Sequence, residues 1–197
     1  TFAGSFGIAG CFSFFPTKVI TSGEGGMITT NNSNITKKLR EMTSYGGEHS
    51  WGMNYRMTKI GAFIGNLQLK RLNKMNEKRI KIARDRISFL EGNEKIILPE
   101  INKKLENVFY LFPIILKNKF SRSDRDLVLK ILEKDYKIIC SIPKNINKRW
   151  SFVKKHYGIP KLKNTDFVYD RIFCPIMHPK LNSKQNLFLS AAILKSL

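Results

Sequence analysis

The first third of the chain alternates short apolar segments with glycine-rich turns. Gly10–Phe15 and Gly26–Thr30 have the length and composition of two short strands. The glycines of Gly23–Gly26 permit the positive φ angles that a tight reversal between these strands needs. Ser33–Tyr45 then places apolar residues at spacings of three and four, so it predicts a helix. A polar, glycine-rich loop is expected to follow it at Gly46–Gly52.

A helical pattern resumes at Thr58 and continues into a long basic segment. The apolar positions that share one side of the first helix are Ile60, Ile64, Leu67 and Leu72. Gly61, Ala62 and Gly65 leave a smooth patch on it, where another helix or subunit could approach closely. A second, basic helix is predicted from about Asn76 to Leu90.

The remainder of the chain mixes strand and helix patterns. The near-continuous apolar run Val108–Leu116 predicts a strand, and Lys137–Ile142 predicts a second one. Between them, Ser123 with Asp126 is a plausible helix start, because a serine can cap and an acid three residues later suits the N-terminal dipole. Further helices are expected to begin at Thr165 and at Asn182–Ser183. The pattern therefore predicts an α/β fold throughout.

The charge of the chain raises the possibility of an anionic partner. The 197 residues carry a formal net charge of +20, with 35 lysines and arginines against 15 acidic residues. Such a balance is found in proteins that bind nucleic acid or another anionic surface. The basic residues are scattered in pairs such as Lys37–Lys38 and Lys154–Lys155, and no nucleic-acid motif accompanies them. We therefore interpret the charge as a solvated lysine-rich surface, and keep a basic nucleic-acid-binding module as an alternative.

Cysteine usage and the lack of long apolar runs restrict the class of protein further. Cys11, Cys140 and Cys174 are widely spaced and odd in number, which argues against a disulfide framework or a zinc site and fits a reducing cytoplasm. Each is expected to act as a small core hydrophobe. There is no signal-peptide pattern and no membrane-length apolar segment, so the sequence supports neither secretion nor a membrane partner.

Lys18 is the residue most clearly suited to covalent chemistry. It follows the apolar segment that contains Phe12, Phe14 and Phe15, and it precedes the glycine-rich turn. A lysine amine forms Schiff bases with carbonyl compounds and with pyridoxal phosphate, and desolvation lowers its pKa toward the range where it is reactive. The three phenylalanines could form an apolar wall that keeps water away from this amine. A solvated lysine at a strand end is the common alternative for a lone lysine.

Three sequence blocks strengthen the reactive interpretation of Lys18. The first reads Ser13-Phe-Phe-Pro-Thr-Lys18 followed by Thr21-Ser-Gly-Glu-Gly-Gly-Met27; the others are Asn54-Tyr-Arg-Met-Thr58 and Pro175-Ile-Met-His-Pro-Lys-Leu181. In this order and spacing they resemble the DegT/DnrJ/StrS family of pyridoxal-phosphate-dependent nucleotide-sugar aminotransferases. The resemblance covers nearly the whole chain. Lysine at position 18 also separates it from the related sugar dehydratases, which carry histidine there.

The resemblance implies a fold and a division into domains. Residues 1–73 would be the C-terminal part of the large cofactor-binding domain of a fold-type-I aminotransferase, and residues 74–197 the small C-terminal α/β domain. Members of the family are about twice as long as this chain, with the lysine near the middle. The chain is therefore expected to be the C-terminal half of such an enzyme. The other half would bring the phosphate-binding turn, the aromatic that stacks on the cofactor ring, and the acid that pairs with the ring nitrogen.

The resemblance also implies the roles of individual residues. Lys18 would be the catalytic, cofactor-binding lysine, and Ser13 would hydrogen-bond the cofactor phosphate. Asn54 would reach that phosphate from the neighbouring subunit of a homodimer with shared active sites. Arg56 would meet the phosphates of the substrate, or form an ion pair with the other half of the enzyme.

Two positions depart from the family pattern. Asn147 and Tyr110 stand where family histidines that tend to line the sugar site are expected. His178 lies in a proline-flanked turn and is interpreted as structural. The expected activity is transfer of an amino group, with glutamate as the expected donor, to a keto carbon of a nucleotide-linked sugar for polysaccharide, lipopolysaccharide or glycan synthesis. A catalytically inactive fragment is the other alternative.

Overall fold

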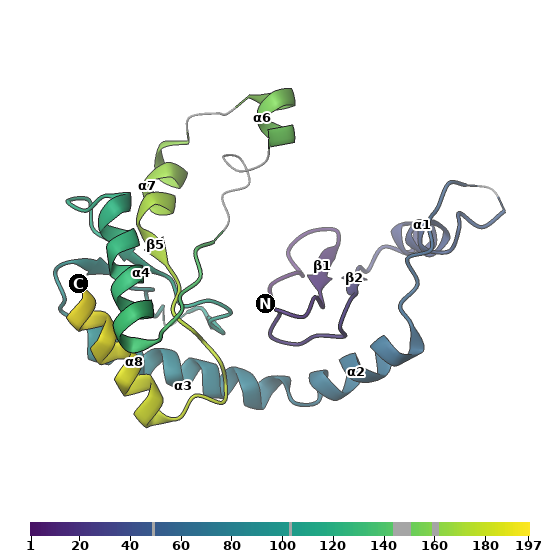
Figure 1. Ribbon diagram of the computed structural model, residues 1–197. Coiled ribbons are helices and arrows are strands. Elements are labelled where there is room, and N and C mark those ends of the chain that lie inside the picture. Colours follow the sequence, from purple (N-terminus) through teal and green to yellow (C-terminus); the bar gives the residue numbers. More distant parts are fainter. Residues whose placement is uncertain (49, 103, 144–150, 159–161) are drawn as a thin grey trace. The chain divides into compact units, whose positions relative to one another are not determined.

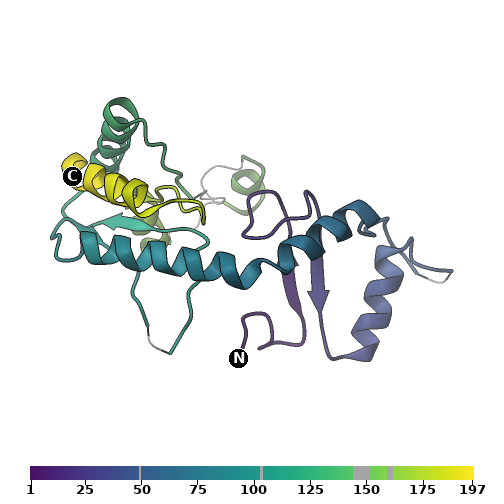
Figure 2. The ribbon, with the colours of Figure 1, turned by 90° about the horizontal axis from the view of Figure 1, so that it is seen from below.

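The structure, a computed structural model, describes residues 1–48, 50–102, 104–143, 151–158 and 162–197. These residues form two compact units, Thr1–Met75 and Asn76–Leu197. Helix α3 (Leu72–Leu90) crosses the division, which falls in its first turn. Figures 1 and 2 show strands and helices in both parts of the chain, so the predicted α/β class is confirmed.

The first unit is built from one small hairpin and two capped helices. Its elements are β1 (Gly10–Ser13), β2 (Gly26–Thr29), α1 (Ser33–Thr43) and α2 (Lys59–Leu69). The two strands pair antiparallel, with Ser13 opposite Gly26. Asn32 caps α1 by accepting a hydrogen bond from the Ile35 amide at 3.1 Å, and Thr58 caps α2 by accepting one from the Gly61 amide at 3.0 Å. Side-chain caps of this kind satisfy amides that a helix start leaves unpaired.

The second unit has a small sheet and most of the helices. Its elements are β3 (Ile96–Ile97), β4 (Ile114–Leu116), α4 (Arg122–Tyr136), α6 (Ser151–Tyr157), α7 (Lys163–Arg171), β5 (Ile172–Phe173) and α8 (Ser183–Ser196). The sheet is antiparallel, in the order β3-β4-β5. Helices α4 and α8 lie next to each other (Figure 1). Helix α8 is also joined to α3, because the Asn186 amide nitrogen donates to the Ile82 carbonyl at 3.0 Å.

The two units differ sharply in what they bury. All the buried apolar side chains of the described residues belong to the second unit, where the most enclosed are Ala83, Phe112, Ile114, Leu132, Phe173 and Ile193. In the first unit, the described buried residues are Gly10, Ser22, Gly46 and Gly61. Many of its large apolar side chains, such as Ile60 and Phe63 on α2, are exposed, and the others are at most half-buried. The described residues of the first unit therefore form no hydrophobic core of their own.

Of the two strand predictions in the second unit, one is wrong in extent and the other is wrong altogether. Of Val108–Leu116, only β4 is a strand, because Phe109 has a φ of 51° and Pro113 lacks the amide that a ladder needs. Lys137–Ile142 forms no strand: Lys137 is the left-handed C-cap of α4, and the only pairing there among the described residues is a single bridge between Ser141 and Cys174.

The helix predictions are closer, with small corrections to the starts of α3, α4 and α7, of which α7 begins at Lys163 rather than Thr165. The cap of α4 is Ser121 with Asp124, two residues before the predicted pair, and it forms a reciprocal capping box. The same Ser-x-x-Asp spacing occurs twice in succession here, so the motif alone could not select the start. The start predicted at Asn182 is confirmed, because Asn182 and Gln185 form a capping box. Helix α3 begins at Leu72 rather than Asn76.

Candidate active site

Lys18 lies in a loop between β1 and β2 that the backbone of Phe14 holds closed. The Phe14 amide donates to the Gly25 carbonyl at 2.9 Å, and the Phe14 carbonyl accepts from the Ser22 amide at 3.1 Å. The Thr21 hydroxyl donates to that same carbonyl at 2.9 Å. Inside the loop, the Lys18 amide donates to the Phe15 carbonyl at 2.9 Å. Lys18 is thus held on a short, cross-linked loop and is half-buried.

The phenylalanines before Lys18 do not enclose it within this chain. Phe12 is 42% exposed and Phe15 is 45% exposed, and Phe14 is half-buried. The apolar wall predicted from these phenylalanines therefore does not enclose Lys18 within the described residues. Further polypeptide would have to cover these rings before they could lower the local dielectric.

The smooth patch predicted on α2 receives the loop that carries Lys18. A Cβ placed on Gly61 would lie 3.5 Å from the Ser22 carbonyl oxygen and 3.1 Å from the Thr58 hydroxyl oxygen. A Cβ placed on Gly65 would lie 3.7 Å from the Ser22 Cβ. The two glycines let α2 approach Ser22, a buried polar residue that donates its hydroxyl proton to the Glu24 carbonyl at 2.8 Å. This contact of α2 with Ser22 supports the part of the lysine loop that precedes β2.

Ser13 ends β1 at the start of the same loop. Its side chain is exposed, and its hydroxyl oxygen accepts a hydrogen bond from the Phe15 amide at 3.4 Å. Because that oxygen acts as the acceptor, the hydroxyl proton is available for a further acceptor such as a phosphate oxygen. The structure therefore places Ser13 and Lys18 on one loop.

Asn54 and Arg56 form a second pair on the segment between α1 and α2. Asn54 bridges to Ser44, and its carboxamide oxygen accepts from the Arg56 Nε at 3.1 Å. The Arg56 guanidinium also lies 5.2 Å from the centre of the Tyr45 ring. The NH₂ group of the Asn54 carboxamide is a hydrogen-bond donor in addition. Both side chains are exposed.

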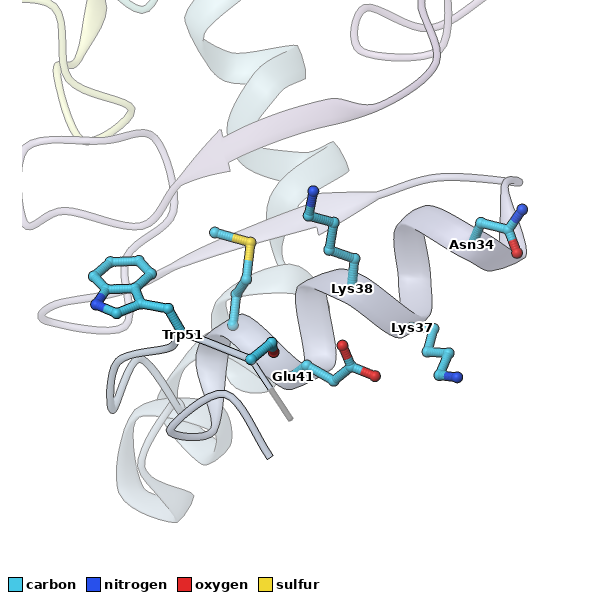
Figure 3. Close-up of a pocket in the computed structure, with 7 residues that line it drawn as sticks. Asn34, Lys37, Lys38, Glu41 and Trp51 are labelled. Carbon is cyan, nitrogen blue, oxygen red and sulfur yellow. The ribbon is translucent and has the colours of Figure 1, made fainter. Parts of the chain in front are cut away.

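A cavity of about 540 Å³ lies elsewhere in the first unit, along α1 and the loop that follows it (Figure 3). It is lined by Asn34, Lys37, Lys38, Glu41, Met42, Ser50 and Trp51. None of the four predicted site residues lines it. Trp51, one of the lining residues, was not predicted from the sequence, and it is 72% exposed. A tryptophan in a polar loop is the signal that could have pointed to it.

The positions that depart from the family pattern are only partly described. Asn147 lies outside the described residues. Tyr110 follows the left-handed Phe109 and is 37% exposed. Within the ranges that the structure covers, no group of three His, Cys, Asp or Glu side chains is arranged to hold a metal ion. No helix in those ranges is both long and apolar enough to cross a membrane.

The three cysteines differ in exposure and in acidity. Cys174 is buried as predicted, but the prediction is wrong for Cys11, which is exposed because the first unit has no core. Burial raises the pKa of the Cys140 thiol to about 12, with a smaller contribution from Cys174. Burial also raises the pKa of the Cys174 thiol to about 11. Neither thiol is suited to act as a nucleophile at neutral pH.

We expect iodoacetamide to distinguish these thiols at pH 8. Cys11 should react quickly because it is accessible, whereas Cys140 and Cys174 should react only after unfolding, since a thiol of pKa about 12 is ionised only to about one part in 10⁴. Mass spectrometry of peptides from native and urea-treated protein measures this. Cys11→Ser should leave no rapidly reacting thiol in the native chain. Rapid native modification of Cys140 would contradict the prediction.

Comparison with known proteins identifies the family of the chain. The model of the DegT/DnrJ/EryC1/StrS aminotransferase family matches residues 2–190. An uncharacterized protein of Methanocaldococcus jannaschii is 30% identical, over 98% of this chain and 54% of its own length. The GDP-perosamine synthase of Caulobacter vibrioides is 36% identical over 66% of this chain and 37% of its own length. The chain spans about half the length, or less, of the curated relatives it matches.

Solved structures show the same fold. A DegT/DnrJ/EryC1/StrS aminotransferase from Brucella abortus superposes with a TM-score of 0.84 at 26% identity, covering 98% of this chain and 52% of that one. Helicobacter pylori PseC, an aminotransferase involved in the biosynthesis of pseudoaminic acid, superposes with a TM-score of 0.88 at 24% identity, covering 97% and 53%. The resemblance inferred from the three sequence blocks is therefore confirmed. This chain belongs to the DegT/DnrJ/EryC1/StrS aminotransferase family.

Proposed function

We propose that this chain is the lysine-bearing half of a pyridoxal-phosphate-dependent aminotransferase. The enzyme would transfer an amino group, with glutamate as the donor, to a keto carbon of a nucleotide-linked sugar in cytoplasmic polysaccharide or glycan biosynthesis. The observation that carries the proposal is Lys18, held on a cross-linked loop beside Ser13 in a member of this family. The names of the relatives, among them a GDP-perosamine synthase and a UDP-sugar transaminase, support the substrate class.

The side chains present fit the proposed cofactor. Pyridoxal phosphate needs an amine for its aldehyde and donors for its phosphate, and it supplies an electron sink when bound. Lys18 offers the amine, the Ser13 hydroxyl offers one donor, and the Asn54 NH₂ group offers another. Neutral donors of this kind bind phosphate with a small desolvation cost.

Lys18 would also transfer the proton during the reaction. When its amine is released by the incoming amino group, its Nζ can take a proton from one carbon and return it to another as general base and then general acid. Positioning of Nζ matters for this transfer, because proton transfer requires hydrogen-bond distance. The bonds from Thr21 and Ser22 to the Phe14 carbonyl restrict the loop that sets that position.

The exposed apolar side chains of the first unit indicate what would complete the enzyme. Ile60, Phe63 and Leu67 on α2 are between 46% and 75% exposed, a degree of exposure that isolated domains seldom show over one helix face. We propose that the half of the family length which this chain does not span covers them. A second copy of the enzyme would then bring its Asn54 to the cofactor phosphate, giving a homodimer with shared sites. Transamination by this chain alone, without the other half of the family length, would contradict this arrangement.

Transamination by the completed enzyme should depend on Lys18. The chain is mixed with the first half of a family relative, a nucleotide keto-sugar and glutamate, and 2-oxoglutarate is measured. We expect Lys18→Ala to lower kcat by about 10³-fold or more, because both the covalent and the proton roles are lost. Lys74→Ala, an exposed lysine on α3, is the matched control and should retain activity. Equal activity of both variants would refute the role of Lys18, and no activity with any partner half would favour the inactive-fragment alternative.

A further inference from the structure

The hydroxyl group of Thr21 connects both ends of the loop that carries Lys18. It donates to the Phe14 carbonyl at 2.9 Å and accepts a hydrogen bond from the Gly23 amide at 2.9 Å. A threonine hydroxyl has one proton to donate and lone pairs that accept, and Thr21 uses both capacities on the backbone. Thr21 is half-buried, so its hydroxyl would lose hydration without compensation if these bonds were not made. The two bonds therefore constrain the chain on both sides of the loop, and we call them the Thr21 clamp.

The loop closes at the Phe14 carbonyl. Besides the Thr21 hydroxyl, this carbonyl accepts the Ser22 amide at 3.1 Å, and one carbonyl oxygen has two lone pairs for two such donors. Residues 15–20, with Lys18 among them, project from this closed base. The position of the Lys18 backbone therefore depends on the bonds that the base makes.

The second bond of the Thr21 hydroxyl holds the glycine turn. Gly23 has a φ of 82°, a backbone conformation that glycine adopts without a steric cost. Its amide lies two residues after Thr21, and a bond from such an amide to a threonine hydroxyl is a common way to stabilise a turn. The turn leads into β2, which pairs with β1. Thr21 thus fixes both the base of the loop and the path of the chain back into the hairpin.

The next residue, Ser22, attaches the same part of the loop to α2. Ser22 is 5% exposed, and a Cβ placed on Gly61 would lie 3.5 Å from its carbonyl oxygen. This contact uses the backbone and the Cβ of Ser22, and it does not involve the Thr21 hydroxyl. Loss of that hydroxyl would therefore loosen the loop without detaching it from α2.

We propose that Thr21 is a positioning residue for the Lys18 amine. By joining the Phe14 carbonyl to the Gly23 amide, its hydroxyl holds the backbone from which the lysine side chain extends, so that Nζ reaches the atoms between which it transfers a proton. Proton transfer needs a heavy-atom distance of about 2.6–3.2 Å, and a misplacement of about 1 Å can lower a rate about 10²-fold. The effect on the reaction rests on the proposed function; the Thr21 clamp does not.

Amide hydrogen exchange of the 197-residue chain, followed by NMR, tests the Thr21 clamp without the cofactor. Thr21→Ala and Thr21→Ser form a matched pair, because they differ from each other only by the hydroxyl oxygen. We expect the Gly23 amide to exchange about 10-fold faster in Thr21→Ala than in the unmodified chain, since it loses its acceptor, and Thr21→Ser to restore the slower rate.

The control for this measurement is Thr36→Val. The Thr36 hydroxyl donates to the Asn32 carbonyl at 3.1 Å in the same unit, and its loss should leave the exchange at Gly23 unchanged. The buried apolar side chains of the described residues all lie in the second unit, so none of these variants removes part of that core. Equal exchange at Gly23 in Thr21→Ala and Thr21→Ser, or an unmodified Gly23 amide as fast as in urea, overturns the inference.

The role in the reaction is tested in the mixture with the first half of a family relative. We expect Thr21→Ala to lower kcat about 10²-fold while the KM for the nucleotide keto-sugar stays nearly unchanged, because a positioning residue of the amine does not bind the substrate. Thr21→Ser should recover most of the lost rate, and Thr36→Val should keep the full rate. A loss of rate that only follows a loss of assembled enzyme would show a general effect on stability and would overturn the positioning role.

Failure of this inference and failure of the proposed function give different results. If Thr21→Ala and Thr21→Ser have the same kcat while Lys18 proves essential for transamination, the positioning role fails and the proposed function stands. If Lys18 proves dispensable while the exchange at Gly23 follows the hydroxyl, the proposed function fails and the Thr21 clamp stands.

Discussion

Pyridoxal phosphate should not remain bound to the 197-residue chain through gel filtration, although Lys18 is present. The amine alone gives no specificity, because any accessible lysine reacts reversibly with an aldehyde. Retention requires donors to the phosphate and a wall that excludes water. Ser13 and Asn54 are exposed, and Phe12 and Phe15 remain open to solvent. We expect loss of the cofactor's yellow colour from the protein fraction.

The first half of a family relative should reverse this result. With that half present, the mixture should retain the cofactor, and borohydride should then fix it to a peptide containing Lys18. Lys18→Ala should abolish the fixed adduct, while Lys74→Ala should not affect it. A stoichiometric adduct on Lys18 in the isolated chain would show that this half forms a complete site, and would contradict our account of the open first unit.

The local elements were the most predictable part of the fold. Asn182 as the cap of α8 followed from its own sequence, because a cap is satisfied by a residue three positions away. The glycine turn before β2 was equally local: Gly23 and Gly25 both have positive φ. Interactions within a few residues need no knowledge of the rest of the chain.

Features that depend on distant residues were not predictable. Val108–Leu116 looks like a strand, but the Phe109 carbonyl is turned to Arg79, thirty residues earlier in the chain, at 3.1 Å. The expectation that Cys11 is buried failed for the related reason that nothing in the first unit covers it. No sequence pattern reports which partner an apolar residue meets.

For the residues of the candidate site, the sequence predicted which of them share a loop and not which of them bind one another. The spacing of Ser13 and Lys18 placed them on one loop, and Phe14 holds that loop closed. The bond from Arg56 to Asn54 was not expected, since Arg56 was assigned to substrate phosphates or to an ion pair. Asn54 and Arg56 are two residues apart on an exposed segment, so their side chains are within hydrogen-bonding reach of each other. The sequence alone does not show which of several possible partners an arginine binds.

The second unit should fold without the first. A chain cut to Leu72–Leu197 keeps α3 whole and all the described buried apolar side chains, including Phe112, Phe173 and Ile193. We expect it to unfold cooperatively in urea, at the same midpoint as the main transition of the full chain. Limited proteolysis of the full chain should remove residues before Leu72 first, because those residues bury no apolar side chain that would resist local opening.

Two leucine substitutions provide the matched test of this difference. Leu132 on α4 is 0% exposed, and Leu132→Ala should destabilise both the full and the shortened chain by about 2–5 kcal/mol through lost burial and a residual cavity. Leu67 on α2 is 46% exposed, and Leu67→Ala should change the stability of the full chain by no more than about 0.5 kcal/mol. If Leu67→Ala cost as much as Leu132→Ala in the isolated chain, α2 would already be covered there, by a second copy or by residues of the same chain. When the first half of a family relative is added, the cost of Leu67→Ala should rise, because α2 then becomes part of a buried interface.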